Sequence, residues 1–294
     1  MQQNSFSTIG LIGKYSDSCV EETLNRLGEY LGNRVTKVLL DEATAEVVPG
    51  LGLETASRDE LGSRCDLVIV VGGDGTLLNA VRSLANYSVP LLGINLGHLG
   101  FLADISPDCM VQCLEEVLSG NYQEEKRCLL HAAIMHDGEV ITESCAFNDV
   151  VIHKWDIARM IEMETAINGV YVNTIRADGL IVSTPTGSTA YALSGGGPIL
   201  YPSLEALVLV PICPHTMSNR PIVVHSSSVI EVVVAEHSQP YAQVTCDGQV
   251  NLGLTAGDQV VIKTGPQPVR LIHPAGHDHF ELLRAKLHWG RRLA

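Results

Sequence analysis

Residues 67–77, LVIVVGGDGTL, decide the fold of this chain. Residues 67–71 are five consecutive apolar side chains, which is typical of a central parallel strand that is covered on both faces. Three glycines among residues 72–75 then allow the backbone to turn tightly and to approach a ligand closely. Residues 77–85 have helical spacing, so the stretch predicts a strand, a glycine loop and a helix. Free N–H groups at the start of such a helix favour the binding of phosphate.

The rest of the first 125 residues alternates between strands and helices. The predicted strands are short apolar runs, at residues 7–13, 35–41 and 89–95. Residues 20–31 have the spacing of an amphipathic helix, and a further predicted helix begins at Pro107 and ends at Gly120. This order predicts an α/β domain with a parallel sheet over residues 1–125.

Three dipeptides that favour tight hairpin turns punctuate the second half of the chain. They are Asp137-Gly138, Asn168-Gly169 and Asp247-Gly248, each between runs rich in β-forming residues. Residues 223–234 and 259–264 are further β-rich runs. We therefore expect a mostly antiparallel, sandwich-like domain over residues 126–274. Residues 282–293 have helical spacing, and we expect the segment 275–294 to pack back on the first domain.

The composition excludes several classes of protein. The chain has 294 residues, 46% of them hydrophobic and 18% charged, as in soluble two-domain proteins. Its formal net charge of −14 leaves no basic stripe for a nucleic acid. No apolar run approaches the roughly 18 to 20 residues that span a bilayer, and the N-terminal residues do not resemble a signal peptide. We therefore expect a cytoplasmic protein with neither a nucleic-acid nor a membrane partner.

The cysteines and histidines do not predict a metal site. Only Cys109 and Cys113, of eight scattered cysteines, are close in sequence, and burial on their predicted helix explains them more simply. His273, His277 and His279 invite a zinc interpretation, but a proline and a glycine interrupt the segment and no cysteine matches it. We therefore expect a solvated loop at these histidines, and no protein-bound metal.

Asp74 is the unusual residue of the glycine loop. A carboxylate among phosphate-binding amides is electrostatically unfavourable unless it holds a cation or takes a proton. The alternative is that Asp74 caps the following helix. The loop is neither a P-loop, because no Gly-Lys-Ser/Thr follows, nor a dinucleotide-binding loop, because Leu78 occupies the last glycine position. The local sequence leaves both interpretations of Asp74 open.

Two longer motifs resemble those of known kinases. Residues 72–76, GGDGT, resemble the signature of the superfamily that contains NAD kinases, 6-phosphofructokinases and diacylglycerol and sphingosine kinases. Residues 178–191, DGLIVSTPTGSTAY, resemble a block of NAD kinases specifically, and the prolines and the histidine of residues 210–221 are also similar to that family. The resemblance covers residues 7 to 290.

This resemblance implies an activity and an architecture. A member of the family would transfer the γ-phosphoryl group of ATP, bound with Mg²⁺ or another divalent cation, to the adenosine ribose 2′-hydroxyl of NAD. The site would lie in the cleft between the two domains, and the protein would be a homodimer or homotetramer. The sequence leaves open whether polyphosphate replaces ATP, whether NAD is preferred to NADH, which nucleotides inhibit and how many subunits assemble.

The resemblance also assigns roles to the two most specific motifs. It makes Asp74 the general base, which lies between the ligand-binding glycines Gly73 and Gly75. It places Asn148 and Asp149 against the adenosine part of NAD, although most members have glutamate where this chain has Asp149. The shorter acid has less reach, and a hydrogen-bonded turn is the alternative for the pair.

Further residues of the nucleotide pocket are implied in the same way. They are Thr186, Thr189, Ala190 and Tyr191, with Ser194 just beyond. A glycine-rich turn before the next helix is the alternative. An arginine at Arg176 accompanies a preference for NAD over NADH in the family, and Asp178 lies near the nicotinamide end. Arg159 and Gln249 are weaker correspondences, for which ordinary surface positions are the alternative.

Two other functions share these motifs. A GGDGT-type kinase could use a lipid or a sugar as the acceptor, although this acidic chain shows no membrane-binding surface. A non-catalytic sensor could bind NAD(P) on the same fold, but the presence of Asp74 disfavours it.

Overall fold

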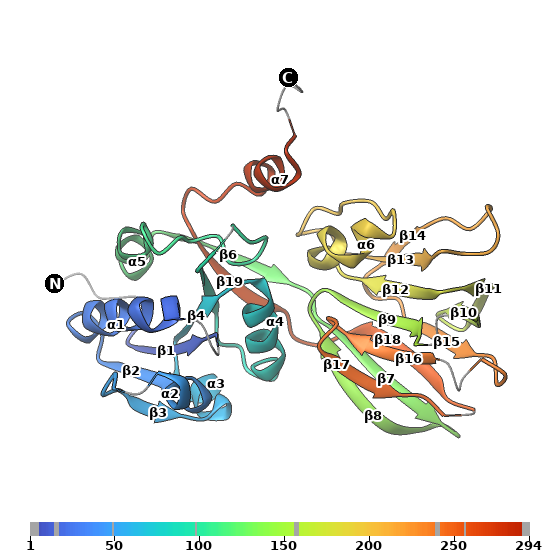
Figure 1. Cartoon of the computed structure of the whole chain (residues 1–294), viewed down its shortest axis with the longest axis horizontal. Helices are drawn as coiled ribbons and strands as arrows, with labels where there is room; N and C mark the ends of the chain where they lie inside the picture. The colour runs from blue at the N-terminus through green and yellow to red at the C-terminus, as the bar shows by residue number, and fades with distance from the viewer. Residues whose placement is uncertain are drawn as a thin grey trace. The chain divides into compact units, whose positions relative to one another are not determined.

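The computed structural model describes residues 6–14, 18–48, 50–97, 99–155, 159–238, 242–255 and 257–289. Its elements form two compact units (Figure 1). The first unit combines Met1–Lys126 with Val269–Ala294, and the second is Arg127–Pro268.

The first unit contains the predicted parallel sheet. Its strands are β1 (Thr8–Gly13), β2 (Lys37–Asp41), β3 (Glu54–Ala56), β4 (Leu67–Gly72), β5 (Leu91–Asn95), β6 (Tyr122–Arg127) and β19 (Val269–Pro274). The order across the sheet is β3-β2-β1-β4-β5-β19-β6, and β4 lies between β1 and β5 with parallel pairing to both. Every residue of β4 is buried, as its apolar run predicts.

Helices cover this sheet. They are α1 (Ser18–Gly32), α2 (Glu42–Val47), α3 (Arg58–Arg64), α4 (Asp74–Ser83) and α5 (Met110–Leu118); the unit also contains α7 (His279–Leu287), which Figure 1 shows apart from the sheet. Leu24 of α1 and Leu114 of α5 share one core with Ile69 of β4. The sequence analysis did not predict α2, β3 and α3, because each is too short to show a period. Local hydrogen bonds set the two helices: Asp41 caps α2, and Ser57 forms a capping box with Glu60 at α3.

The second unit is the predicted antiparallel sandwich. One six-stranded sheet has the order β11-β10-β15-β18-β7-β8 and the other the order β14-β13-β12-β9-β16-β17. The first consists of β7 (Leu130–His136), β8 (Glu139–Ala146), β10 (Ile161–Ile167), β11 (Val170–Ala177), β15 (Ile230–Val234) and β18 (Gln259–Thr264). The second consists of β9 (Asp149–Lys154), β12 (Gly179–Ser183), β13 (Ala206–Ile212), β14 (Ile222–His225), β16 (Ala242–Cys246) and β17 (Val250–Gly253). Both contribute to one core, in which Ile134 and Val232 lie with Ile152 and Leu180.

The three predicted hairpin turns are confirmed. Both residues of each dipeptide have a positive φ, from 48° and 82° at Asp137-Gly138 to 51° and 62° at Asp247-Gly248. Two positive φ angles are the requirement of a type I′ turn. The β-rich run 223–234, in contrast, is not one strand. It supplies β14 and β15 to different sheets, with a turn at residues 226–228 between them.

The C-terminal histidines are not in a solvated loop. β19 is an interior strand that lies between β5 and β6, so His273 is only 2% exposed. His279, the first residue of α7, is also buried. Because β19 joins the sheet of the first unit, the chain returns to that unit at Val269. The sequence analysis had extended the second domain to residue 274.

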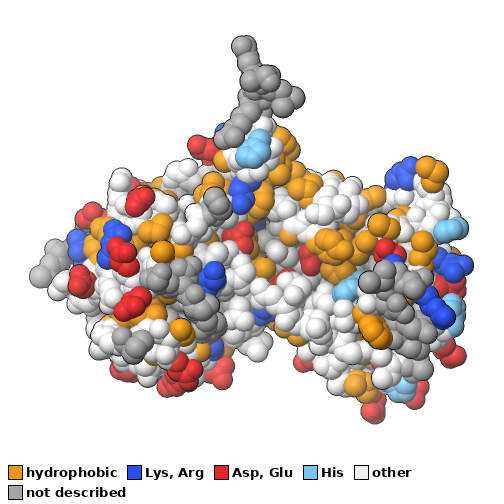
Figure 2. All heavy atoms as spheres, viewed as in Figure 1, with side chains coloured by type: hydrophobic (Ala, Val, Ile, Leu, Met, Phe, Trp, Pro, Cys, Tyr) orange, Lys and Arg blue, Asp and Glu red, His pale blue; other side chains and the backbone are white. Residues whose placement is uncertain are grey.

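The surface carries mixed charge. On the face that Figure 2 shows, basic side chains are interspersed with acidic ones. No disulfide links the cysteines of the described residues. None of the helices in the described part of the chain is long and apolar enough to cross a membrane.

Candidate active site

Asp74 lies where β4 passes into α4. The N-cap residue of α4 is Gly73, and no side chain makes a capping hydrogen bond. The Asp74 carboxylate instead accepts three backbone N–H groups of the loop that follows β5. Oδ2 accepts from Phe101 at 2.8 Å, and Oδ1 accepts from Leu102 and Ala103, both at 3.1 Å. The alternative that Asp74 caps the helix is therefore wrong.

These three amides orient the Asp74 carboxylate but do not occupy all of its hydrogen-bond acceptor positions. A carboxylate offers about four lone-pair positions. Both acceptor positions of Oδ1 are used, whereas Oδ2 accepts from Phe101 alone among the described donors. The remaining position on Oδ2 is able to accept the proton of a substrate hydroxyl.

Gly100 permits this close approach of loop and carboxylate. A Cβ atom at Gly100 would lie 2.1 Å from Asp74 Oδ1 and 3.0 Å from the carbonyl oxygen of Ala103. Any side chain there would push the carboxylate away from its amide donors. The loop therefore requires glycine at residue 100.

A pocket of about 430 Å³ opens beside the glycine loop of the first unit. Its lining residues are Gly13, Lys14, Arg58, Gly73, Gly75, Thr76 and Asn79. Two of them are cations, and Arg58 is held in place by Asp41, with 2.6 Å between Arg58 Nε and Asp41 Oδ1. The pocket lies at the carboxyl ends of β1 and β4 and at the N-terminus of α4, where N–H groups and the helix dipole favour anions. Its chemistry suits the phosphates of a nucleotide.

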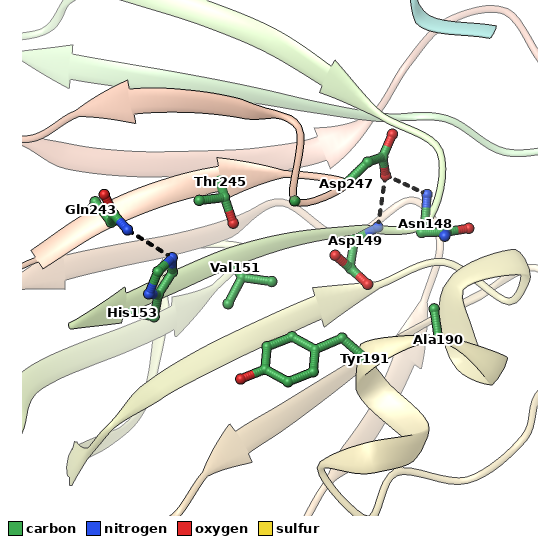
Figure 3. Close-up of a pocket in the computed structure, with 10 residues that line it drawn as sticks. Asn148, Asp149, Val151, His153, Ala190, Tyr191, Gln243, Thr245 and Asp247 are labelled. Carbon is green, nitrogen blue, oxygen red and sulfur yellow. Dashed lines mark hydrogen bonds between the residues drawn. The ribbon is translucent and has the colours of Figure 1, made fainter. Parts of the chain in front are cut away.

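The second unit has a pocket of its own, also of about 430 Å³ (Figure 3). The predicted residues Asn148, Asp149, Ala190 and Tyr191 all line it. They come from the start of β9 and from the segment where a 3₁₀ turn (Thr186–Thr189) leads into α6 (Tyr191–Ser194). Figure 3 shows the ring of Tyr191 and the Asp149 carboxylate directed into the same space.

The sequence analysis did not assign the other six lining residues to the site: Val151, His153, Gln243, Thr245, Asp247 and Gly248. Residues 149, 151 and 153 alternate along β9, so they share one face of the sheet. Antiparallel pairing with β16 brings Thr245 opposite Val151 and Gln243 opposite His153 on that face. The alternation is visible in the sequence, but the partner strand and its register are not.

Asp149 and Asp247 form the charged end of this pocket. Asp247 accepts backbone N–H groups from Phe147, Asn148 and Asp149 at 3.0, 2.7 and 3.2 Å. Asp149 is only 4% exposed. Burial, and next the charge of Asp247, raise the pKa of Asp149 to about 7. Near neutral pH, Asp149 is thus able either to donate or to accept a hydrogen bond.

Comparison with known proteins agrees with this geometry. Residues 9–122 match the model of the ATP-NAD kinase N-terminal domain, and residues 147–274 match that of the ATP-NAD kinase C-terminal domain. The NAD kinase of Nitrosococcus oceani is 50% identical over 288 residues, which are 98% of each chain. The NAD kinase of Pseudomonas putida is 51% identical over 288 residues, 98% of this chain and 97% of the relative. The chain belongs to the ATP-NAD kinase family.

Solved structures support the same family. Yeast NADH kinase complexed with NADH matches with a TM-score of 0.89 at 26% identity, over 99% of this chain and 91% of the yeast chain. An NAD kinase from Archaeoglobus fulgidus in complex with ATP matches with a TM-score of 0.74 at 27% identity, over 96% and 98%. The predictions of an NAD kinase fold and of an NAD kinase function are confirmed. A lipid or sugar kinase and a non-catalytic sensor are not favoured.

The other residues of the second unit that the family resemblance singled out do not line its pocket. Among the described residues, its lining does not include Arg159, Arg176, Asp178, Thr186, Thr189, Ser194 or Gln249. Thr186 is buried and accepts from Arg127 Nη1 at 3.3 Å, and Thr189 donates to the Thr186 carbonyl. Both therefore shape the turn that presents Ala190 and Tyr191.

The remaining positions in this family member are more exposed. Asp178 pairs with Lys154 at 2.6 Å, and Arg176 is exposed on β11. Arg159, Ser194 and Gln249 are also exposed, and Gln249 follows the turn that carries Asp247. Their roles toward NAD stay predictions.

Proposed function

We propose that Asp74 is the general base of an NAD kinase reaction in this chain. It accepts the proton of the adenosine ribose 2′-hydroxyl as that oxygen attacks the γ-phosphorus of ATP, and ADP leaves. One observation carries the proposal: three backbone amides orient the carboxylate beside a phosphate-binding loop and leave one acceptor position on Oδ2. Phosphoryl transfer depends mainly on positioning and charge stabilisation, and a fixed acid that orients the hydroxyl provides the first.

We infer that the pocket beside the glycine loop binds the phosphates of ATP. Lys14 and Arg58 supply positive charge, and Gly73 and Gly75 line the pocket at the N-terminus of α4, where the helix dipole favours phosphate oxygens. A divalent cation fits this donor set, because Thr76 and Asn79 offer the oxygen ligands that Mg²⁺ accepts beside phosphates. When bound, Mg²⁺ would neutralise charge on the transferred group. The ATP complex of the A. fulgidus kinase supports ATP as the donor.

We infer that the pocket of the second unit binds the dinucleotide. Tyr191 offers an aromatic face for a base, and Asn148 and Asp149 offer groups that hydrogen-bond to adenosine. Asp149 is one methylene shorter than the glutamate of most family members. The shorter side chain still lines the pocket, although it is only 4% exposed. The NADH complex of the yeast kinase supports a dinucleotide ligand.

We also expect a cytoplasmic homodimer or homotetramer. The free thiols of all eight cysteines suit a reducing compartment. Val170, Tyr171 and Val172 form an exposed apolar strip on β11, which lies at a sheet edge and suits subunit contacts. Light scattering after gel filtration would measure the mass of the assembly.

A coupled assay for NADP tests the base. The purified chain is incubated with NAD, ATP and Mg²⁺, beside the variants Asp74→Asn and Asp108→Asn. We expect NADP from the wild type and a loss of about 10²-fold or more in kcat for Asp74→Asn, because an amide does not take the proton. Asp108 is an exposed acid of the same unit, so its variant should keep the wild-type rate.

Two results would contradict the assignment. Nearly full activity of Asp74→Asn would exclude Asp74 as the base. NAD binding by the wild type without any NADP formation would favour a sensor instead.

A further inference from the structure

A second cluster of chemically active side chains lies in the first unit, and none of its residues lines either pocket. Asp104 follows the loop whose amides bind Asp74, His273 belongs to β19, and His277 lies in the turn before α7. His273 is 2% exposed and the side chain of His277 is 6% exposed. Residues almost 170 positions apart in sequence thus meet at one buried point.

The potential metal-ligand atoms of the three side chains lie close together. Nδ1 of His273 lies 3.1 Å from Asp104 Oδ2, and Nδ1 of His277 lies 2.6 Å from the same oxygen. The two rings are stacked, with 4.0 Å between centroids and 23° between planes. One ligand atom from each residue lies within 4.8 Å of the other two. Two bonds of about 2.1 Å, the length of Zn–N and Zn–O bonds, span most of such a separation.

The surroundings resemble the outer shell of a metal site. Nε2 of His273 is buried without a hydrogen-bond partner among the described residues, and its nearest carboxylate oxygen, Oε2 of Glu125, is 3.7 Å away. Metal-ligating histidines commonly direct their second nitrogen toward a carboxylate in this way. If the cluster were only a hydrogen-bonded network, this buried nitrogen would be a lasting energetic cost.

We propose that Asp104, His273 and His277 form a site for a Zn²⁺-class divalent cation. Two imidazole nitrogens and one carboxylate oxygen suit Zn²⁺ or Co²⁺, whereas Mg²⁺ and Ca²⁺ prefer oxygen ligands alone. Binding needs both Nδ1 atoms free of protons, so the protons that they share with Asp104 move to Nε2 or leave to solvent. On His273, Glu125 is placed to receive that N–H.

The site has a structural role in the fold. Asp104 is the residue after Ala103, whose amide binds Asp74. His273 and His277 belong to the C-terminal segment that completes the first unit. A bound cation would fasten this segment to the loop that orients the base. It would stabilise the unit through residues that line neither proposed substrate pocket.

Metal content and cobalt spectroscopy test the site in the full-length chain. The protein is purified without a histidine tag, freed of metal with a chelator and titrated with Zn²⁺ and Co²⁺ at neutral pH. We expect one tightly held equivalent per chain after gel filtration, visible absorption bands of protein-bound Co²⁺, and a rise of several degrees in Tm.

Variants show which side chains hold the ion. His277→Gln and Asp104→Asn should each lower the zinc affinity by at least about 10-fold and abolish the cobalt bands. The matched control is His136→Gln, since His136 pairs with buried Asp258 at 2.8 Å in the second unit. This variant should bind the metal like the wild type.

The proposal fails if the wild-type chain retains no zinc or cobalt, a result that does not depend on any variant folding. It also fails if His277→Gln binds with the same affinity and spectrum as the wild type. Equal losses of zinc affinity in His136→Gln and His277→Gln would show that the metal binds to histidines in general rather than to this cluster. This result would also overturn the proposal.

Discussion

Asp149 is a buried acid whose charge opposes folding at alkaline pH. Its pKa of about 7 lies above the ordinary value near 3.8, because burial and the charge of Asp247 disfavour its anion. Asp149 thus contributes no penalty below about pH 4, and its penalty grows as the pH rises to about 7. A ribose hydroxyl that donates to Asp149 would relieve this penalty, which couples the stability of the pocket to its occupation.

The variant Asp149→Asn tests this electrostatic cost. Relative to the wild type, the ligand-free variant should gain about 2 kcal/mol in free energy of unfolding between pH 5.5 and 8.0, since one pKa unit corresponds to about 1.4 kcal/mol. Urea unfolding at the two pH values measures the difference. Asp137→Asn, at an exposed hairpin turn, is the control and should show no such pH dependence. Parallel pH curves for the wild type and Asp149→Asn would contradict the raised pKa.

At the scale of elements, the loop after β5 orients the proposed base. Its amides at residues 101–103 orient Asp74, and Gly100 makes the approach possible. β4 and β5 are neighbouring parallel strands, so their carboxyl ends place the glycine loop and this second loop side by side. The orientation of Asp74 therefore depends on two loops of the sheet rather than on the GGDGT motif alone.

The substitution Gly100→Ala separates this positioning from the chemistry of the acid. The added methyl group would displace the Asp74 carboxylate, and we expect kcat to fall by about 10-fold or more while KM for NAD changes little. Gly97→Ala is the matched control, because a Cβ atom there meets nothing within 4 Å. Steady-state kinetics measure kcat and KM of the two variants. Equal kcat values for Gly100→Ala and Gly97→Ala would show that the amide contacts do not orient Asp74.

At the scale of the whole molecule, the proposed base and the proposed dinucleotide pocket belong to different units. Asp74 lies in the first unit, whereas the pocket with Asn148, Asp149 and Tyr191 lies in the second. Substitutions in the two units should therefore have different kinetic signatures.

Calorimetric titration with NAD tests this division. Tyr191→Ala should weaken NAD binding by about 10-fold, because a stacked base loses an aromatic partner. Asp74→Asn should leave Kd within about threefold while it abolishes turnover. Tyr201→Ala is the matched control, because Tyr201 is 45% exposed and Tyr191 is 47% exposed, but Tyr201 does not line the pocket. This control variant should bind NAD like the wild type. A large rise in Kd for Asp74→Asn would mean that the acid also holds the dinucleotide.

The sequence by itself determined the fold class, the three hairpin turns and the glycine loop, and its resemblance to the family pointed to Asn148, Asp149, Ala190 and Tyr191, which line the second pocket. These features depend on local patterns: consecutive apolar residues, turn dipeptides and contiguous motifs, whose chemistry is complete within a few residues. The same reasoning left Asp74 between two interpretations, because its partners lie 27 to 29 residues away.

Only the tertiary structure decided which distant side chains meet. The pairing of β9 with β16 brought Gln243, Thr245 and Asp247 to the second pocket, and the insertion of β19 between β5 and β6 buried the histidines that the sequence placed in solvent. Strand partners and register follow from the packing of the whole core, which a local pattern of residues does not contain.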